Sequence, residues 1–257
     1  MKINQKEETL HLIDIGNTSA TYGLAKNGKI MKTEALSSCQ IPEKIINYPK
    51  SGRNLSQKVI ISSVVPKITE KLISDLNAHG TFEIIVIGAD LQVPLKTNYK
   101  NVSKLGIDRK INAYGAISSH KIPSIILDFG TALTCDLVDE KGIFLGGLII
   151  PGPATSLKSL LSNTAMLPKL FSLKKAPAKP YGRNTDECIQ HGVIQAYAAM
   201  TDGLINKLSK EFKESPHVII TGGFSAFIGK IIHSKAAVNP AHTLESMLHL
   251  YLNNKKA

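Results

Sequence analysis

Two short segments that begin with aspartate and contain glycine have the composition of a phosphate-binding turn. One is DIGNT, residues 14–18, and the other is DFGTALT, residues 128–134. Glycine lets consecutive backbone N–H groups approach phosphate oxygens, and Asn and Thr side chains add donors. The aspartate would repel phosphate unless a cation lies between them, and Mg²⁺ or a monovalent ion meets that need. The pattern predicts nucleotide binding without a P-loop, since GxxxxGK[ST] is absent.

A single Asp-x-Gly is also common in ordinary turns, so one copy alone would favour a purely structural interpretation. The repetition of the pattern, with Thr at matching places, favours function instead. A third segment, TGGF at residues 221–224, adds a bare Gly222-Gly223 backbone that could approach the adenosine end of a nucleotide.

The segment GIDRKINAYGA, residues 106–116, could supply a base and an anion-binding group. Its apolar residues recur at helical spacing, which places Asp108 and Arg109 in the first turn of a helix. The helix dipole there favours an ionised carboxylate, which could accept a proton from a substrate hydroxyl during phosphoryl transfer. The planar fork of Arg109 suits a substrate carboxylate. The alternative is a capping aspartate beside a surface arginine.

The N-terminal half is predicted to be an α/β lobe that carries the first turn. LHLIDIG reads as a strand, and Asn27-Gly28 between two extended stretches predicts a hairpin. Residues 58–65 form a β-branched strand, Pro66 begins a helix that Gly80 ends, and residues 83–88 form another strand.

The C-terminal half repeats this scheme around the second turn. Residues 124–130 and 217–224 read as strands, a loop rich in Pro and Lys covers 168–184, and the last helix lies near 242–252. A long helix over 186–213 is predicted from one apolar stripe: Ile189, Val193, Tyr197, Met200, Leu204 and Leu208.

The two acidic turns lie 128 − 14 = 114 residues apart, each at the end of a buried strand. We therefore expect a duplicated α/β fold with lobes at 1–120 and 121–257 and a central cleft lined by one turn from each. The second lobe would carry the adenosine motif.

Composition narrows the class of protein. The net charge of +11 is compatible with nucleic acid, acidic membrane surfaces or polyanionic small molecules, but the lysines are scattered and only 5% of residues are aromatic. Three distant cysteines and eight unclustered histidines predict neither a disulfide framework nor a structural zinc site. With no apolar run long enough for a bilayer and no secretory signal, we expect a cytoplasmic protein.

The ordered set of motifs resembles the type III pantothenate kinases, which have the acetate/sugar kinase–Hsp70–actin fold. The resemblance covers residues 10–252, and any one motif would be weak alone. The motifs in order are DIGNT (14–18), Tyr99, GIDR (106–109), DFGTALTCD (128–136), GGLIIPG (146–152), GRNT (182–185) and TGG (221–223).

The resemblance implies two ribonuclease H-like, actin-like ATPase lobes and a transferase that phosphorylates the hydroxyl of pantothenate with ATP, the first step of coenzyme A biosynthesis. It implies Asp108 as the general base, Asp14 near Mg²⁺ and Asp128 as ligand of a monovalent cation, K⁺ or NH₄⁺. It implies a homodimer, because Thr185 matches a residue that reaches pantothenate from the partner subunit. Pantothenate contacts are implied for Tyr99, Gly106, Ile107, Asp108, Arg109 and Thr185. ATP contacts are implied for Asp14, Ile15, Gly16, Asn17, Thr18, Ser19, Ala20, Thr21 and Thr131.

The chain departs from the family pattern at two positions. Val102 stands where a proline is usual, and Phe224 follows TGG where an aspartate is common. Two other functions stay open: a kinase for another small hydroxy acid, and a non-catalytic accessory factor for transcription that binds nucleic acid through its positive charge. A gel-shift titration against salt would distinguish the last of these, since specific binding would show a steep salt dependence.

Overall fold

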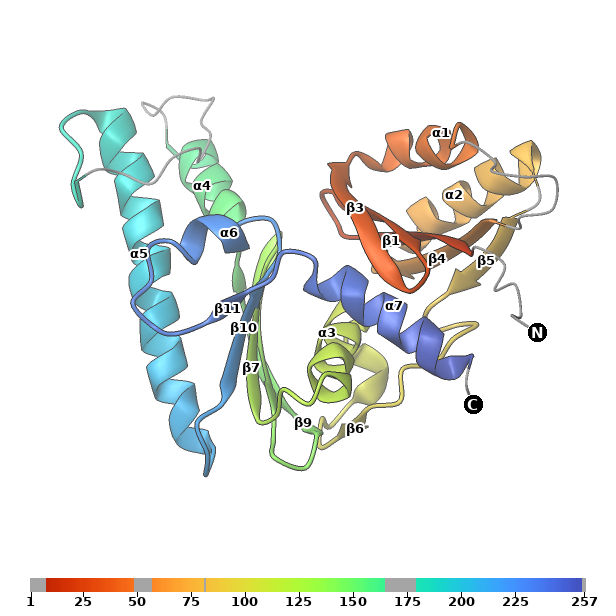
Figure 1. Ribbon diagram of the computed structural model, residues 1–257. Coiled ribbons are helices and arrows are strands. Elements are labelled where there is room, and N and C mark those ends of the chain that lie inside the picture. Colours follow the sequence, from red (N-terminus) through yellow and green to blue (C-terminus); the bar gives the residue numbers. More distant parts are fainter. Residues whose placement is uncertain (1–7, 49–56, 81, 165–178, 256–257) are drawn as a thin grey trace. The chain divides into compact units, whose positions relative to one another are not determined.

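The computed structural model describes residues 8–48, 57–80, 82–164 and 179–255, which form two compact units (Figure 1). Unit 1 contains residues 1–95, 103–118 and 241–257, and unit 2 contains residues 96–102 and 119–240. A 3₁₀ turn, Val102–Lys104, lies where the chain passes from one to the other. The units therefore differ from the expected consecutive lobes, 1–120 and 121–257, because the last helix belongs with the first lobe.

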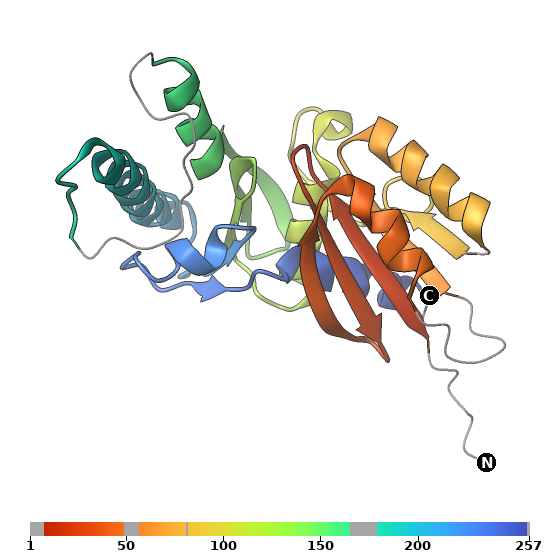
Figure 2. The ribbon, with the colours of Figure 1, turned by 90° about the horizontal axis from the view of Figure 1, so that it is seen from above.

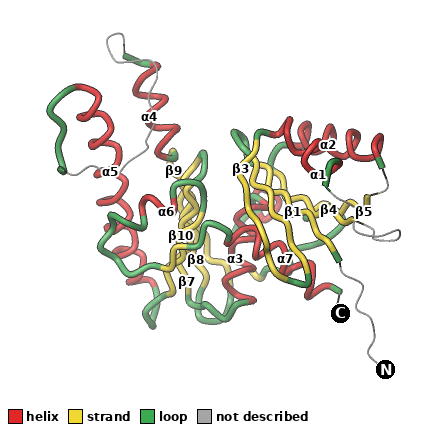
Figure 3. Tube along the Cα trace, turned by 45° about the horizontal axis from the view of Figure 1, so that its top comes forward, coloured by secondary structure: helices red, strands yellow, loops and turns green. Residues whose placement is uncertain are grey.

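Unit 1 is a five-stranded mixed sheet with helices on both faces (Figure 3). The strand order is β3-β2-β1-β4-β5, and β1 pairs antiparallel with β2 but parallel with β4. The strands are β1 (Thr9–Ile15), β2 (Ala20–Lys26), β3 (Lys29–Leu36), β4 (Gln57–Ser63) and β5 (Phe82–Val86). The helices are η1 (Ser38–Gln40), α1 (Ile41–Ile46), α2 (Pro66–His79), α3 (Ile107–Ser118) and α7 (His242–Asn254).

Successive side chains of β1 face opposite sides of the sheet in unit 1. Ile13 and Ile15 pack in a cluster with residues of α1 and α2, whereas Leu10 and Leu12 pack in a cluster with residues of α3 and α7. Because successive side chains of a strand point to opposite faces, Asp14 lies on the same face as Leu12. The sheet therefore presents Asp14 on the face that α3 covers.

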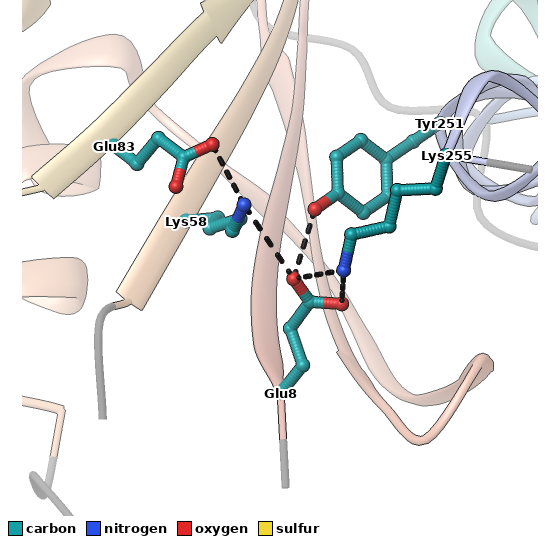
Figure 4. A network of polar contacts seen from close by, with 5 residues as sticks. All are labelled: Glu8, Lys58, Glu83, Tyr251 and Lys255. Carbon is teal, nitrogen blue, oxygen red and sulfur yellow. Dashed lines mark hydrogen bonds and ion pairs between the residues drawn. The ribbon is translucent and has the colours of Figure 1, made fainter. Parts of the chain in front are cut away.

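The end of α7 is tied to the sheet of unit 1 by a polar network (Figure 4). The Glu8 carboxylate accepts hydrogen bonds from Lys255 Nζ and Tyr251 Oη, each at 2.8 Å, and pairs with Lys58 Nζ at 3.7 Å. Lys58 also bonds Glu83, at 2.7 Å. Burial would raise the pKa of Glu8, but the hydrogen bonds from Lys255 and Tyr251 outweigh it and hold that pKa below its usual value.

Unit 2 contains a six-stranded sheet whose order is β11-β10-β7-β8-β9-β6. The strands are β6 (Lys96–Thr97), β7 (Ser124–Phe129), β8 (Ala132–Val138), β9 (Ile143–Pro151), β10 (His217–Thr221) and β11 (Ala237–Val238). The helices are α4 (Pro153–Ser162), α5 (Thr185–Leu208), η3 (Ser209–Glu211) and α6 (Ser225–Ile228). Ile125, Leu127 and Phe129 of β7 pack with residues of α5 and α6, so Asp128 lies on the opposite face of the sheet.

The two sheets repeat one topology. In unit 2, β9-β8-β7 are antiparallel neighbours, and β10 and β11 follow β7 in parallel. This is the arrangement of β3-β2-β1 followed by β4 and β5 in unit 1. The duplication predicted from the two acidic turns is confirmed, since β1 and β7 occupy equivalent places in the two sheets.

Most predicted elements are present within a few residues. Asn27 and Gly28 both have positive φ between β2 and β3, as the hairpin prediction requires. Helix α5, which Figure 2 views almost along its axis, ends at Leu208 rather than near 213. The Pro- and Lys-rich loop lies partly outside the described residues, at 165–178.

The predicted stripe on α5 was wrong in part. Ile189 and Tyr197 are buried as expected, and Val193, Met200 and Leu208 are partly buried and pack against the core of unit 2. The prediction missed Ile194, Thr201 and Ile205, which are buried beside them. A polar residue can take a buried position because the Thr201 hydroxyl donates to the backbone carbonyl of Tyr197, at 2.6 Å. A stripe predicted from apolar residues alone could not include Thr201.

Candidate active site

The first acidic turn joins β1 to β2 in unit 1. Gly16 N–H donates to the Ser19 carbonyl at 3.0 Å, which closes the turn, and the residues between them, Asn17 and Thr18, are exposed with Ser19. Gly16 does not have a positive φ; a Cβ there would lie 3.3 Å from the Ser19 carbonyl oxygen. The side chains of Ile15 and Ala20 are buried, so only their backbone could contact a nucleotide.

Asp14 is held by a partner that the sequence analysis missed. Ser62, which pairs with Asp14 across β1 and β4, donates its hydroxyl to Asp14 Oδ1 at 2.8 Å. Burial raises the pKa of Asp14, the bond from Ser62 lowers it and the negative charge of Asp108 raises it, which together bring that pKa to about 6. The only sequence signal for Ser62 was a polar residue at the end of an apolar strand.

Asp108 lies in the first turn of α3, as predicted. Its Oδ1 accepts a hydrogen bond from the Arg109 N–H at 2.8 Å, which helps to fix the carboxylate at the N-terminus of the helix. A Cβ on Gly106 would overlap Asp108 Oδ1, so the absence of a side chain at Gly106 gives the carboxylate its space. Arg109 is 5% exposed, which contradicts the alternative of a surface arginine.

In unit 2, Asp128 has a comparable setting. It pairs with Thr221 across β7 and β10, and a Cβ on Gly222 would overlap Asp128 Oδ1. Gly222 also has φ +88°, which favours glycine. The Thr221 hydroxyl is buried and has no hydrogen-bond partner within the described part of the chain. Oxygen atoms of these types are the ligands that hard cations take.

The departure at Phe224 has a packing role. Phe224 packs against the hydrophobic cluster between the sheet of unit 2 and helices α5 and α6, and its N–H donates to the Phe129 carbonyl at 3.4 Å. The side chain therefore helps to hold the TGG segment beside β7. The other departure, Val102, is 45% exposed.

The remaining predicted residues of unit 2, Tyr99, Thr185 and Thr131, lie at three further places. The Tyr99 ring lies 6.0 Å from the Phe144 ring, centroid to centroid, and its N–H donates to Thr97 Oγ1 at 2.9 Å. Thr185 begins α5 and is exposed; Asn184 caps the helix by accepting from the Glu187 N–H at 2.9 Å. Thr131 is exposed in the turn between β7 and β8.

The structure thus brings Asp14 and Asp108 together within unit 1, and Asp128 with the TGG segment within unit 2. Tyr99 belongs to unit 2, although it precedes Asp108 by only nine residues. Among the described residues, no three or more His, Cys, Asp or Glu side chains are grouped so that they could hold a metal ion by themselves. A cation beside Asp14 or Asp128 would need further ligands, such as phosphate oxygens.

None of the described helices is long and apolar enough to cross a membrane.

Two copies of one sheet topology, each with an aspartate at the end of its first strand, define the duplicated ribonuclease H-like fold of the actin-like ATPases. Solved structures agree on this fold. An ethanolamine utilization protein EutJ from Carboxydothermus hydrogenoformans matches with a TM-score of 0.52 at 10% identity, covering 98% of this chain and 91% of its own. A Campylobacter jejuni protein described as a candidate Baf family transcriptional activator matches with a TM-score of 0.59 at 24% identity, covering 96% and 100%.

Sequence comparison gives the particular family. The family model for type III pantothenate kinase matches residues 10–207. Type III pantothenate kinases from Sulfurihydrogenibium sp. (strain YO3AOP1) and Persephonella marina are 38% and 34% identical, over 92% and 93% of this chain and 94% and 96% of their own. The chain belongs to the type III pantothenate kinase family.

Proposed function

We propose that Asp108 is the general base of the reaction that family membership gives this chain, the ATP-dependent phosphorylation of pantothenate in coenzyme A biosynthesis. The observation that carries the proposal is the pair of carboxylates in unit 1, where the charge of Asp108 raises the pKa of Asp14. One of two neighbouring carboxylates can serve the nucleotide and the other the acceptor hydroxyl.

In this proposal the acceptor hydroxyl of pantothenate attacks the γ-phosphorus of ATP. A bond forms between the hydroxyl oxygen and phosphorus, the bond from phosphorus to the ADP oxygen breaks, and the hydroxyl proton passes to the Asp108 carboxylate. Asp108 lies in the first turn of α3, where the helix dipole attracts negative charge. Pantothenate contacts are proposed for Gly106, Ile107 and Arg109 of unit 1, and separately for Tyr99 of unit 2.

The nucleotide is proposed to bind along residues 14–21, with Thr131 as a further contact. Mg²⁺ bound with ATP would neutralise charge on the phosphates. Asp14 fits the neighbourhood of that cation, because a positive charge would offset the burial and repulsion that raise its pKa. Asp128 is proposed to hold K⁺ or NH₄⁺, and the buried Thr221 hydroxyl without a partner within the described residues supports an oxygen-rich site there.

A homodimer completes the proposal, with Thr185 of each subunit serving the pantothenate site of the other. Two features support a contact surface on unit 2. Thr185 is exposed, and so are several large apolar side chains of the same unit, namely Leu148, Ile149 and Tyr181. Exposed apolar groups of this kind are typical of protein interfaces.

The function is tested with purified protein, ATP, Mg²⁺ and pantothenate, with and without K⁺ or NH₄⁺, by mass-spectrometric detection of 4′-phosphopantothenate. Turnover should require pantothenate and rise with the monovalent cation. Asp108→Asn should lower kcat by about 10²- to 10⁴-fold, the usual contribution of a general base, and still fold. Asp75→Asn, a change at a helix residue paired with Lys71, is the matched control. Near-normal turnover by Asp108→Asn would remove Asp108 as the base.

A further inference from the structure

The turn between β7 and β8 rests directly on the first turn of α4. The Thr131 carbonyl accepts two hydrogen bonds, from the Gly152 N–H at 2.9 Å and from Thr155 Oγ1 at 2.6 Å. A Cβ on Gly152 would overlap the carbonyl oxygens of Gly130 and Thr131. The start of α4 therefore leaves no room for a side chain at Gly152, and the turn and the helix fit against each other through their backbones.

Helix α5 in turn fixes the start of α4. Tyr197 of α5 is 7% exposed, and its hydroxyl donates to the Pro151 carbonyl, directly before Gly152. Ser156 Oγ lies 2.6 Å from the same hydroxyl. Because Tyr197 also packs in the hydrophobic cluster of unit 2, the N-terminal turn of α4 is anchored to the core rather than held only by the turn it supports.

We propose that Thr155 is a positioning residue that orients Thr131 for the nucleotide, an inference that rests on the proposed function. Asp128 and Thr131 are separated by Phe129, which is fully buried, and Gly130, which is exposed. The turn is thus fixed by the core on one side and by Gly152 and Thr155 on the other. Two donors on one carbonyl fix the plane of the peptide between Thr131 and Ala132, and with it the direction of the Thr131 residue.

The test compares Thr155→Val, which keeps the shape and removes the donor, with Thr155→Ser, which keeps the donor. Thr155→Val should raise the KM for ATP by about fivefold, the ratio that corresponds to one net hydrogen bond, and leave the KM for pantothenate within about twofold. Thr155→Ser should restore the KM for ATP. Thr164→Val is the matched control, since the Thr164 hydroxyl bonds the Leu160 carbonyl beyond the other end of α4.

A second readout uses the protein without nucleotide. Hydrogen exchange of the Gly152 amide should be about fivefold faster in Thr155→Val than in the wild type or in Thr155→Ser, because the turn that accepts its bond is less firmly held. An unchanged KM for ATP together with unchanged exchange would overturn the inference, and so would equal effects on the KM values for both substrates. Failure of the proposed function is distinct: the wild type would then not phosphorylate pantothenate, while the Gly152 exchange would still report on Thr155.

Discussion

Three carboxylates of this chain lie so close to a glycine that a Cβ on that glycine would meet them. Gly106 makes room for Asp108 and Gly222 for Asp128, and a Cβ on Gly147 would lie 2.8 Å from Asp136 Oδ1 and closer still to the Cys135 carbonyl oxygen. Each glycine contributes space, and Gly222 also contributes the positive φ that favours glycine. At Gly147 and Gly222 an added Cβ would also overlap backbone atoms, whereas at Gly106 the close neighbours are atoms of the Asp108 carboxylate alone. A methyl group at Gly106 must therefore displace that carboxylate, and its effect on catalysis should exceed its effect on stability.

Gly106→Ala tests this at the proposed base. The added methyl group should displace the Asp108 carboxylate and lower kcat by about ten- to a hundredfold, as small misplacements of catalytic groups do, with little change in the KM for ATP. Steady-state kinetics and a melting curve measure the two effects. Gly192→Ala is the control, because a Cβ on Gly192 meets nothing within 4 Å. If both alanine variants retain full kcat, the carboxylate does not depend on the space at Gly106.

The ionisation of Asp14 should reduce stability at neutral pH. Its folded-state pKa is about 6, above an unfolded value near 3.9, so stability falls as pH rises through this window and stays lower above it. Asp14→Asn removes that cost. We expect its melting temperature in the absence of ligands to exceed that of the wild type by several degrees at pH 7.5, since about 2 pKa units correspond to roughly 2–3 kcal/mol.

The gain should shrink at pH 4.5, because the wild-type carboxyl is then mostly protonated in the folded protein. The same variant should lose most of its kinase activity and most of the stabilisation that Mg²⁺ and ATP give the wild type. Thermal melts at the two pH values, with and without ligands, measure both effects. A lower melting temperature for Asp14→Asn at pH 7.5 would contradict this account of the pKa.

At the scale of elements, α3 carries the proposed base, and α7 sets its place in unit 1. The two helices approach closely, because Ser246 of α7 occupies the space where Gly115 of α3 would carry a Cβ. Nearby, Thr243 Oγ1 donates to Asn112 Oδ1 at 2.8 Å, and His242 Nε2 bonds the Asn112 carbonyl at 3.0 Å. Helix α3 is therefore held by residues that lie some 130 positions later in the chain.

Gly115→Ala should push the two helices apart. Overpacking of this kind costs about 1–3 kcal/mol, which a chemical denaturation curve would measure, and kcat should fall because Asp108 moves with α3. Replacing Ser246 by Gly in the same protein should restore much of the stability, since it removes the atoms that the new methyl group meets. Gly203→Ala on α5, where a Cβ meets nothing within 4 Å, should not destabilise. An equally large loss in that control would show that crowding is not the cause.

Local patterns predicted where most elements lie and which motifs they carry, because hairpin residues, capping prolines and apolar periodicity act within one segment. Asp14 at the end of β1 and Asp108 in the first turn of α3 follow from such signals. Ser62 and Thr155 could not be found in this way, since each matters only through a carboxylate or carbonyl that is distant in sequence. The membership of α7 in unit 1 was missed for the same reason: its apolar stripe predicts a buried face but not the sheet that buries it.

At the scale of the whole molecule, the proposed dimer makes each active site depend on two chains. Asp108→Asn and Thr185→Ala should both be poorly active alone. If Thr185 serves the partner's site, a mixed dimer has one site with both residues intact. After subunit exchange in an equal mixture, half of the dimers are mixed, so activity should recover to about a quarter of the wild-type value in an isologous pair.

Analytical ultracentrifugation would establish the dimer, and activity after mixing would measure the recovery. Mixing each variant with itself is the control. Mixed dimers that show no recovery would place Thr185 in the site of its own subunit, and a monomer at micromolar concentration would remove the shared site altogether.

The tie between Glu8 and Lys255 has a consequence for the order in which the protein is made. Unit 1 includes β1, which is synthesised before unit 2, and helix α7, which leaves the ribosome only after the whole of unit 2. During translation, unit 2 can bury its core while the face of β1 that holds Leu10 and Leu12 still awaits α7. The strand that carries Asp14 is thus made before unit 2 and covered by α7 only after it, which makes the nascent sheet of unit 1 a natural substrate for chaperones.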